Sequence, residues 1–96
     1  MHASIRKYRS SDAPEVGRRA NDDNSGFPPV AREIKGFQAW YLIDSGDGTL
    51  TTVTICDDEA GVNESVDKAR EWVGENAADL VEGSPDVTNG KVEAQA

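Results

Sequence analysis

The sequence predicts an α+β protein with the element order β-α-β-β-α-β, the ferredoxin-like sandwich in which helices cover one face of an antiparallel sheet. Three observations support this order. The stretch 36–58 has the composition of two strands joined by a Gly-Asp-Gly turn, residues 62–80 repeat apolar side chains at helical spacing, and strand-like segments lie near both ends. Crossover connections from the first to the second strand and from the third to the fourth then give the sandwich.

The first third of the chain predicts a strand followed by an interrupted helix. Residues 3–9 form the strand, and Ser10, Ser11 and Asp12 supply capping side chains for the helix that follows. Apolar positions keep one helical spacing through residue 34, but an Asn-Ser-Gly segment and a Pro-Pro pair interrupt it. We therefore predict helical pieces over 12–24 and 28–34, with Gly36 as the C-cap of the second. The break between them permits either a mobile lid or a rigid kink.

The rest of the chain predicts a hairpin, a long helix and a last strand. The hairpin spans 37–44 and 49–57, and its second strand is rich in Thr, Val and Ile. Asp57 and Asp58 can cap the helix that follows, which repeats apolar residues from Val62 to Leu80, and a Gly-Ser-Pro sequence at 83–85 is expected to end it. A short strand over 86–94 closes the domain, with a bulge or bend expected at its Asn-Gly pair.

The first hairpin strand is apolar on both faces, which predicts self-association. Strict alternation sends Phe37, Ala39, Tyr41 and Ile43 to one face and Trp40 and Leu42 to the other. Helices cover only one face of such a sheet, and soluble monomers rarely leave the second face apolar and bare. A second copy of the chain is the expected cover, which would close two sheets into a dimeric α+β barrel. The sequence leaves open which face forms the interface.

Length and composition restrict the class of protein. The 96 residues (10.3 kDa) predict one domain over 1–96, and the formal net charge of −8 argues against nucleic-acid binding. The one basic cluster, Arg6, Lys7 and Arg9, is expected to be split between two faces of the first strand. No apolar leader or membrane-spanning stretch is evident, so we expect a cytoplasmic protein without membrane contact.

Most of the reactive residue types have a structural explanation. The single histidine, His2, lies near the chain end, and with one cysteine there is no Cys/His cluster, so no metal site is expected. The acidic loop 44–48 lacks the order of a calcium-binding EF-hand loop and fits a tight hairpin turn. Cys56 is followed by two aspartates, which should raise the pKa of its thiol, and we interpret it as a packing residue.

The aromatic residues give the strongest indication of a ligand site. Tyr8, Trp40, Tyr41 and Trp72 could line an apolar pocket, with Arg6 on the strand face of Tyr8 to hold an anionic oxygen. The predicted ligand-binding set is Arg6, Tyr8, Trp40 and Tyr41, and no catalytic residue is assigned. The alternative is that the aromatic side chains only pack in the core or at a dimer interface, where tyrosine and tryptophan are also common.

The chain resembles the dimeric α+β barrel superfamily, and within it the antibiotic-biosynthesis-monooxygenase-like proteins of bacteria. The resemblance spans about residues 3–94. It rests on Gly36-Phe37 at the entry of the second strand, on Asp58-Glu59-Ala60 after the third, and on Trp72 in the last helix. It implies a homodimer, and a family in which some members oxidise aromatic polyketides without metal or flavin while others degrade haem.

The haem-degrading members use an early Asn, a Trp and a His on the last helix. This chain has Ser4 and Arg6 in the early strand and no histidine after His2, so haem ligation is not expected. Two hypotheses remain. The first is a homodimeric binding protein without a cofactor, whose ligand is a small apolar or aromatic molecule. The second is a cofactor-independent monooxygenase acting on an aromatic substrate.

Overall fold

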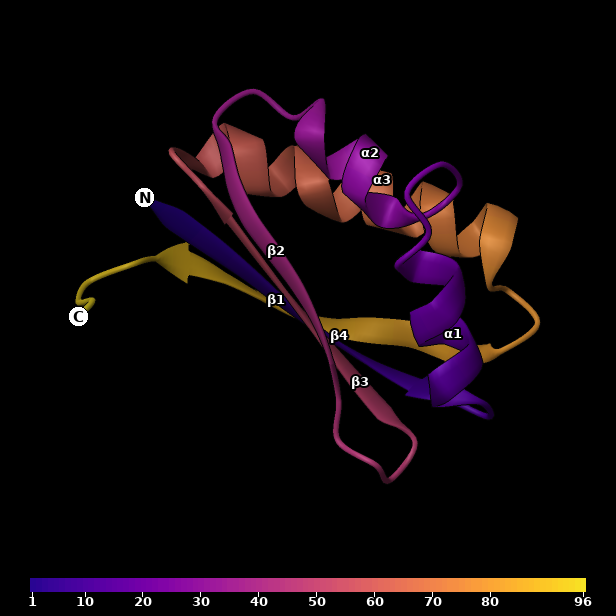
Figure 1. Cartoon of the computed structure of the whole chain (residues 1–96). Helices are drawn as coiled ribbons and strands as arrows, with labels where there is room; N and C mark the ends of the chain where they lie inside the picture. Colours follow the sequence, from indigo (N-terminus) through magenta and orange to yellow (C-terminus); the bar gives the residue numbers. More distant parts are fainter.

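The computed structural model describes residues 1–96 as a four-stranded antiparallel sheet with three helices on one face (Figure 1). The predicted order of elements is confirmed, and the sheet order is β2-β3-β1-β4. The elements are β1 (His2–Ser10), α1 (Ala13–Ala20), α2 (Phe27–Arg32), β2 (Phe37–Asp44), β3 (Thr49–Cys56), α3 (Glu59–Asn76) and β4 (Val81–Lys91).

Strand β1 lies in the middle of the sheet, between β3 and β4, and alternates strictly. Its inward side chains Ser4, Arg6 and Tyr8 are buried, and Lys7 and Arg9 are exposed on the other face. The predicted division of the basic cluster between two faces is thus confirmed. Because the inward positions of a central strand lie under the helices, this alternation takes Arg6 into the interior.

Helix α1 is shorter than predicted, because the Asp22 side chain binds the backbone that would have continued the helix. Helix α1 stops at Ala20 rather than at residue 24. The Asp22 carboxylate accepts hydrogen bonds from the backbone N–H groups of Asn24 and Ser25, both at 2.8 Å. A short polar side chain that bonds to its own neighbouring backbone competes with helix continuation in this way.

The connection between α1 and α2 is closely packed, which favours the rigid-kink interpretation over the mobile lid. The N–H of Gly26 donates to the Asp22 carbonyl at 2.9 Å. A Cβ added at Gly26 would collide with the carbonyl oxygens of Ala20 and Asp22. The indole N–H of Trp72 donates to the Ser25 carbonyl at 2.9 Å and ties the connection to α3.

Helix α2 also differs from its predicted range of 28–34. It begins at Phe27, with Gly26 as N-cap, and ends at Arg32, with Glu33 as C-cap. Gly36 is therefore not the helix cap that we predicted. It lies in the turn into β2 with φ +80, where a Cβ would meet the side chain of Asp57. A glycine is favoured there by the left-handed backbone and by the close approach of β3's end.

The β2–β3 hairpin has the predicted bounds except that β3 ends at Cys56, one residue earlier, and its first strand does not alternate strictly. A bulge between Phe37 and Ala39 shifts the register against β3. The extra residue turns Phe37 toward the helices, where it packs against the hydrophobic core, instead of onto the face of Tyr41 as predicted. In the turn, Asp44 accepts from Gly46 N–H at 2.8 Å and Asp47 from Thr49 N–H at 3.0 Å, as expected for a tight connection.

The C-terminal part shows two further differences from prediction. Helix α3, capped by Asp58 as expected, ends at Asn76, so Leu80 lies in the turn that follows. Strand β4 starts at Val81 and includes the Gly-Ser-Pro sequence 83–85, which we expected to precede it. The strand is tolerant of Pro85 because β4 is an edge strand.

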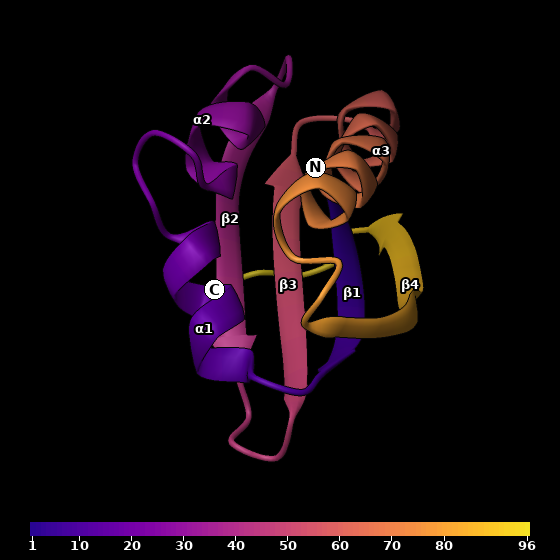
Figure 2. The same ribbon diagram turned by 90° about the vertical axis from the view of Figure 1, so that its right-hand side faces the viewer.

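The register shift in β4 lies at this sequence and not at the Asn-Gly pair. Lys7 pairs with Asp86, whereas Arg9 pairs with Glu82, so β4 carries extra residues over 83–85. Gly83 has φ +65, which allows this local departure. Asn89 and Gly90 continue the ladder without a shift. Figure 2 shows the resulting bend of β4 beside α3.

The hydrophobic core lies between the sheet and the helices, and no helix covers the other sheet face (Figure 1). On that open face Ile5, Val53 and Tyr41 are cross-strand neighbours. Their exposed fractions include 38% for Ile5 and 59% for Tyr41, and Ile43 beside them is 49% exposed. The predicted bare apolar face is therefore present. No helix of the protein is both long and apolar enough to cross a bilayer.

Candidate functional site

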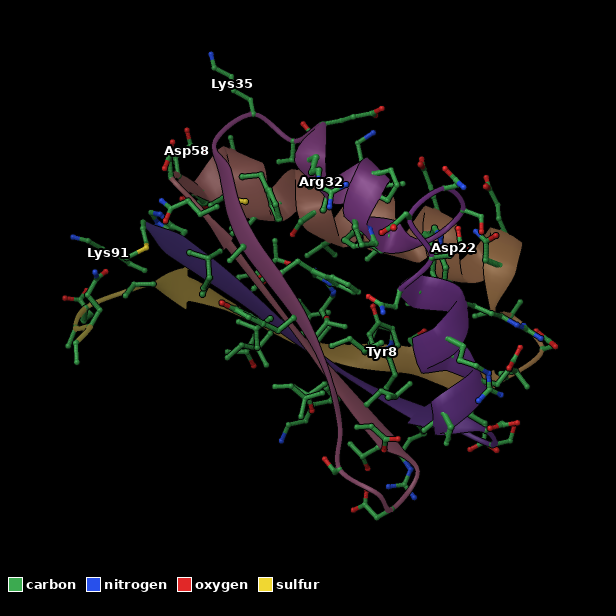
Figure 3. The ribbon with its side chains drawn as sticks, in the orientation of Figure 1. Tyr8, Asp22, Arg32, Lys35, Asp58 and Lys91 are labelled. Carbon is green, nitrogen blue, oxygen red and sulfur yellow. The ribbon has the colours of Figure 1, made fainter.

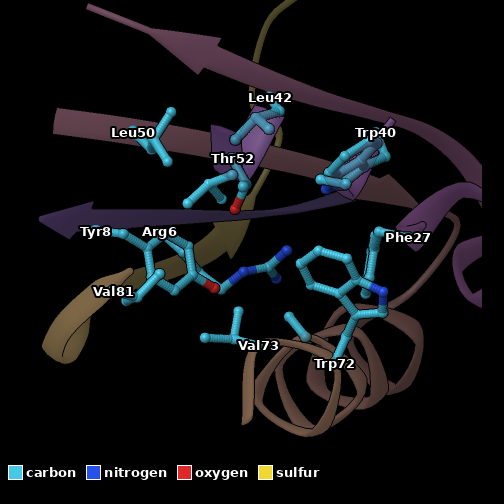
Figure 4. A pocket seen from close by; sticks show the side chains of 13 residues that line it. Arg6, Tyr8, Phe27, Trp40, Leu42, Leu50, Thr52, Trp72, Val73 and Val81 are labelled. Atoms are coloured by element: carbon cyan, nitrogen blue, oxygen red, sulfur yellow. The ribbon is translucent and has the colours of Figure 1, made fainter. Parts of the chain in front are cut away.

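A small chamber lies in the core between the sheet and the helices (Figure 4). Its volume is about 30 Å³, room for one or two water-sized species. The residues around it come from both layers and are Arg6, Tyr8, Val16, Ala20, Phe27, Trp40, Leu42, Leu50, Thr52, Ala69, Trp72, Val73 and Val81. The walls are almost entirely apolar and strongly aromatic, with the rings of Phe27 and Trp40 tilted at 46° and 5.2 Å apart.

Arg6 is the one charged residue of the chamber, and it is 1% exposed. Its guanidinium donates only to hydroxyl groups: Nη1 to Ser4 Oγ at 3.4 Å and to Ser65 Oγ at 3.3 Å, and Nη2 to Thr54 Oγ1 at 3.1 Å. No carboxylate of the chain forms an ion pair with it. The positive charge is thus buried without a compensating negative charge.

Burial lowers the pKa of Arg6, and the neighbouring Tyr8 hydroxyl opposes that shift. Figure 4 shows the Tyr8 hydroxyl beside the arginine side chain. A guanidinium is not deprotonated in proteins at neutral pH, so Arg6 remains charged despite this lowering of its pKa. The chamber therefore keeps a fixed positive charge in an apolar environment, where its interaction with a negative charge is strongest.

Three polar atoms around the chamber have no hydrogen-bond partner. They are Arg6 Nε, Trp40 Nε1 and Thr52 Oγ1, and all three are buried. Buried donors without partners are rare in folded proteins, since each costs about 1–3 kcal/mol. All three residues lie on the helix-facing side of the sheet, in neighbouring strands. The arrangement can donate hydrogen bonds to an acceptor oxygen, provided that the walls move apart to admit it.

The structure brings together three of the four predicted site residues. Arg6, Tyr8 and Trp40 all line the chamber, and in Figure 3 Tyr8 lies between the sheet and the helices. Tyr41 is on the opposite, open face of the sheet. Alternation along β2 explains the separation, because neighbouring residues of a strand point to opposite faces.

Sequence reasoning missed the hydroxyl residues that hold Arg6. Thr54 is a buried inward position of β3 and accepts from Arg6, whereas the neighbouring inward Thr52 is buried beside the arginine without bonding to it. Ser65 comes from α3, and its hydroxyl also donates to the Val62 carbonyl at 2.6 Å. The sequence did contain a signal for this contact. Strand alternation puts Thr52 and Thr54 on the inward side of β3 and Arg6 on the inward side of the neighbouring β1.

The remaining reactive side chains do not join this site. Cys56 is fully buried against Ile34 and Val62, and burial together with Asp58 and Asp57 raises the pKa of its thiol, as predicted. His2 lines a separate surface hollow with Glu59. No three of the His, Cys, Asp and Glu side chains lie close enough together to hold a metal ion.

Comparison with known proteins gives the fold a wider context. The sequence matches no protein-family model and no curated protein. Among solved structures, a protein of unknown function from Nitrosomonas europaea superimposes with a TM-score of 0.73 at 22% identity, over 99% of this chain and 91% of that one.

Two further similar structures have an activity in their descriptions. One is a monooxygenase from Streptomyces coelicolor, encoded by ActVA-Orf6 and solved with the ligand nanaomycin D, with a TM-score of 0.69 at 14% identity over 99% of this chain and 89% of that one. Another is described as an antibiotic biosynthesis monooxygenase, with a TM-score of 0.65 at 14% identity over 98% of this chain and all of that one. The resemblance expected from the sequence is therefore confirmed as a likeness of fold: the chain has the ferredoxin-like α+β fold of the antibiotic-biosynthesis-monooxygenase-like proteins.

Proposed function

We propose that the protein is a homodimer that binds a small aromatic molecule in the chamber, with an acceptor oxygen of that molecule held by Arg6. The observation that carries this proposal is the burial of the Arg6 charge with hydroxyl partners alone. A buried charge without a counter-charge is costly, and proteins keep such groups mainly where a ligand or a reaction uses them. A ligand oxygen with negative character would supply the missing partner.

The surroundings of Arg6 favour an aromatic body for this ligand. The rings of Tyr8, Phe27, Trp40 and Trp72 surround the chamber, and planar apolar walls with few polar atoms suit a planar apolar ligand. The unpartnered donors of Trp40 and Thr52 lie beside the chamber, where they can donate to a second oxygen of the ligand. The chamber is smaller than an aromatic ring system, so binding requires displacement of at least one wall.

A second copy of the chain is the proposed cover of the open sheet face. Ile5, Tyr41 and Ile43 expose apolar surface there, next to the partly buried Val53 and Ile55. Such a contiguous patch favours a protein interface over solvent. In this arrangement Tyr41 contributes to the dimer interface, while Arg6, Tyr8 and Trp40 form the ligand site.

Native mass spectrometry of the protein purified from its own host tests both parts. We expect a dimer, and an additional mass that is lost on mild activation would be the ligand. A monomer at micromolar concentration would refute the homodimer. The ligand part is tested separately with the Arg6→Met variant, which should be isolated without the additional mass. If Arg6→Met retains that mass, the assignment of the ligand to the chamber is wrong.

The second candidate function is a cofactor-independent monooxygenase. It is favoured by the likeness of fold to a monooxygenase solved with nanaomycin D. In such chemistry the deprotonated aromatic substrate itself gives an electron to oxygen, so the protein supplies a dry site and stabilises the anion. Arg6 would hold the anionic oxygen, and Tyr8 would donate a hydrogen bond beside it.

Oxygen consumption with a hydroxylated anthrone-type substrate distinguishes the two candidates. Turnover by the wild-type protein, together with loss of turnover in Arg6→Ala and Tyr8→Phe while the fold is retained, would support the monooxygenase. Binding of the same compound without oxygen consumption would support the binding protein. Turnover that is equal in wild type and both variants would remove these residues from the mechanism.

A further inference from the structure

A second hollow adjoins the chamber on the side of α3 and β4. This groove has a volume of about 350 Å³ and runs between α3 and the bent part of β4. Arg6, Tyr8, Val73 and Val81 line both the groove and the chamber, so they form the wall between the two. A ligand in the groove would thus contact the residues of the chamber on their outer side.

The groove contains no acidic residue, although the chain has 18 of them. Its two charged residues are Arg6 in the floor and Arg70 at the rim, where Arg70 lies 3.6 Å from the exposed Asp67. Three other hollows of the surface each include at least one carboxylate, from Asp44, Glu15 or Glu59 among others. In a protein of net charge −8, an acid-free path to a buried arginine favours an anionic ligand.

The two sides of the groove include glycines whose packing does not require glycine. Gly74 lies inside α3, where glycine costs about 0.5–1 kcal/mol relative to alanine. A Cβ built on Gly74 meets no atom within 4 Å, and the same holds for Gly83 on β4. The absence of a side chain at Gly74 therefore leaves the groove open and adds nothing to helix packing.

The groove side of the chamber is bounded by the edge of the sheet. β4 is an edge strand, hydrogen-bonded only to β1, and nearly all of it beyond Val81 is exposed. On the opposite side, the α1–α2 connection is held by Trp72, by Asp22 and by the close packing of Gly26. The groove side therefore borders a solvent-exposed sheet edge, whereas the opposite side is covered by a tightly packed connection.

From these observations we infer that the groove between α3 and β4 is the entrance of the chamber and that it selects for aromatic anions, with Gly74 keeping it open. This inference rests on the proposed ligand-binding function. It adds the route and the charge of the ligand, and it makes Gly74 a determinant of access.

Two glycines provide a matched test. Gly74→Leu should place a side chain in the groove, and Gly17→Leu should place one in the hollow on the other side, by α1, since an added Cβ meets no atom within 4 Å at either position. Both replace a helical glycine and should keep or increase stability. The probes are 1-anilinonaphthalene-8-sulfonate, an aromatic anion, and N-phenyl-1-naphthylamine, which has the same aromatic body without the charge. Binding is followed by stopped-flow fluorescence.

We expect Gly74→Leu to slow association of the sulfonate at least tenfold, while Gly17→Leu stays within twofold of the wild-type protein. We also expect Arg6→Met to weaken binding of the sulfonate more than tenfold and of the neutral probe much less. If binding of the sulfonate depends on Arg6 but Gly74→Leu associates as fast as Gly17→Leu, the entrance is elsewhere and the ligand site stands. If Arg6→Met changes neither probe, the ligand site itself is wrong and the entrance fails with it.

Discussion

At the scale of the residue, Arg6 determines the electrostatic character of the core chamber. Its charge is held by three hydroxyl groups, from Ser4, Thr54 and Ser65, and hydroxyl groups orient the guanidinium without neutralising it. A carboxylate in their place would form a self-contained buried ion pair with no capacity left for a ligand. The hydroxyl set therefore keeps the charge available, at a cost to stability.

This cost gives the first prediction. Arg6→Met keeps a long side chain of similar reach but removes the uncompensated charge, so the free energy of unfolding should rise by about 1–2 kcal/mol. Urea denaturation followed by tryptophan fluorescence measures it. Arg9→Met, on the open face, is the control and should change stability by less than about 0.5 kcal/mol. A large loss of stability in Arg6→Met would mean that the arginine is a structural residue.

Cys56 gives a second prediction, for the pH dependence of stability. The pKa of its thiol is raised in the folded protein by burial and by Asp58 and Asp57, so the folded state favours the protonated thiol. That contribution is complete below the pKa of the unfolded thiol, about 8.5, and is lost as the pH rises through the folded value. The stability difference between wild type and Cys56→Ala should therefore shrink from pH 7 to pH 9.5 in urea titrations. A difference independent of pH over this range would contradict it.

At the scale of the element, the α1–α2 connection fixes one side of the chamber. The side chains of Asp22 and Trp72 form hydrogen bonds to its backbone, and the N–H of Gly26 donates to the Asp22 carbonyl. Arg19 adds ion pairs to Glu15 and to Asp79, the latter at 2.8 Å. The exposed ion pairs contribute little by themselves. The tight backbone packing at Gly26 contributes more, because no other residue fits there without displacement of two carbonyl groups.

The third prediction compares two glycines of this region. Gly26→Ala should lower the free energy of unfolding by about 2 kcal/mol, since the new methyl group collides with backbone oxygens. Gly17→Ala, with no atom within 4 Å of the new Cβ, should raise it by about 0.5–1 kcal/mol. Thermal unfolding of both variants measures the difference. Equal stability of the two would show that the connection is free to rearrange.

At the scale of the whole molecule, the uncovered sheet face and the net charge act against each other. The apolar patch around Ile5 and Tyr41 favours association of two copies, whereas each copy carries a charge of −8 that opposes it. Salt screens the repulsion over about 8–10 Å at physiological ionic strength but leaves apolar burial in place. The proposed dimer should therefore be stronger in salt.

The fourth prediction concerns this association. The double variant Tyr41→Lys and Ile43→Lys should be monomeric by sedimentation velocity at concentrations where the wild-type protein is dimeric, with an unchanged far-UV spectrum. The wild-type dissociation constant should fall as NaCl rises from 20 to 300 mM. Lys35→Glu, a change in the turn before β2, is the control and should remain dimeric. A double variant that stays dimeric would move the interface to another surface.

The sequence was sufficient for the order of elements because periodicity and caps agreed. Asp12 and Asp58, each among the predicted capping residues, cap their helices, and the hairpin matches its predicted bounds to within one residue. It was insufficient where backbone irregularities decide the outcome. Neither the bulge that turns Phe37 inward nor the inclusion of residues 83–85 in β4 follows from side-chain alternation.

For the candidate site, alternation along β1 was enough to place Arg6 and Tyr8 together. The hydroxyl partners on β3 and α3 could not be assigned, because their meeting with Arg6 depends on the cross-strand register and on the rotation of the helix. Tyr41 was grouped with Trp40 by composition, although neighbouring strand residues face opposite ways.

The two bulges have one more consequence, for the behaviour of the protein when it is crowded. They lie in β2 and β4, the two strands with a free edge, while the inner pair β1–β3 is regular throughout. Open edges invite the addition of further strands and so the growth of fibrils, and an interrupted ladder or a proline such as Pro85 hinders it. The irregularities that sequence reasoning missed thus disfavour edge-to-edge aggregation of a chain with an apolar open sheet, which leaves the sheet face as the surface for the proposed dimer.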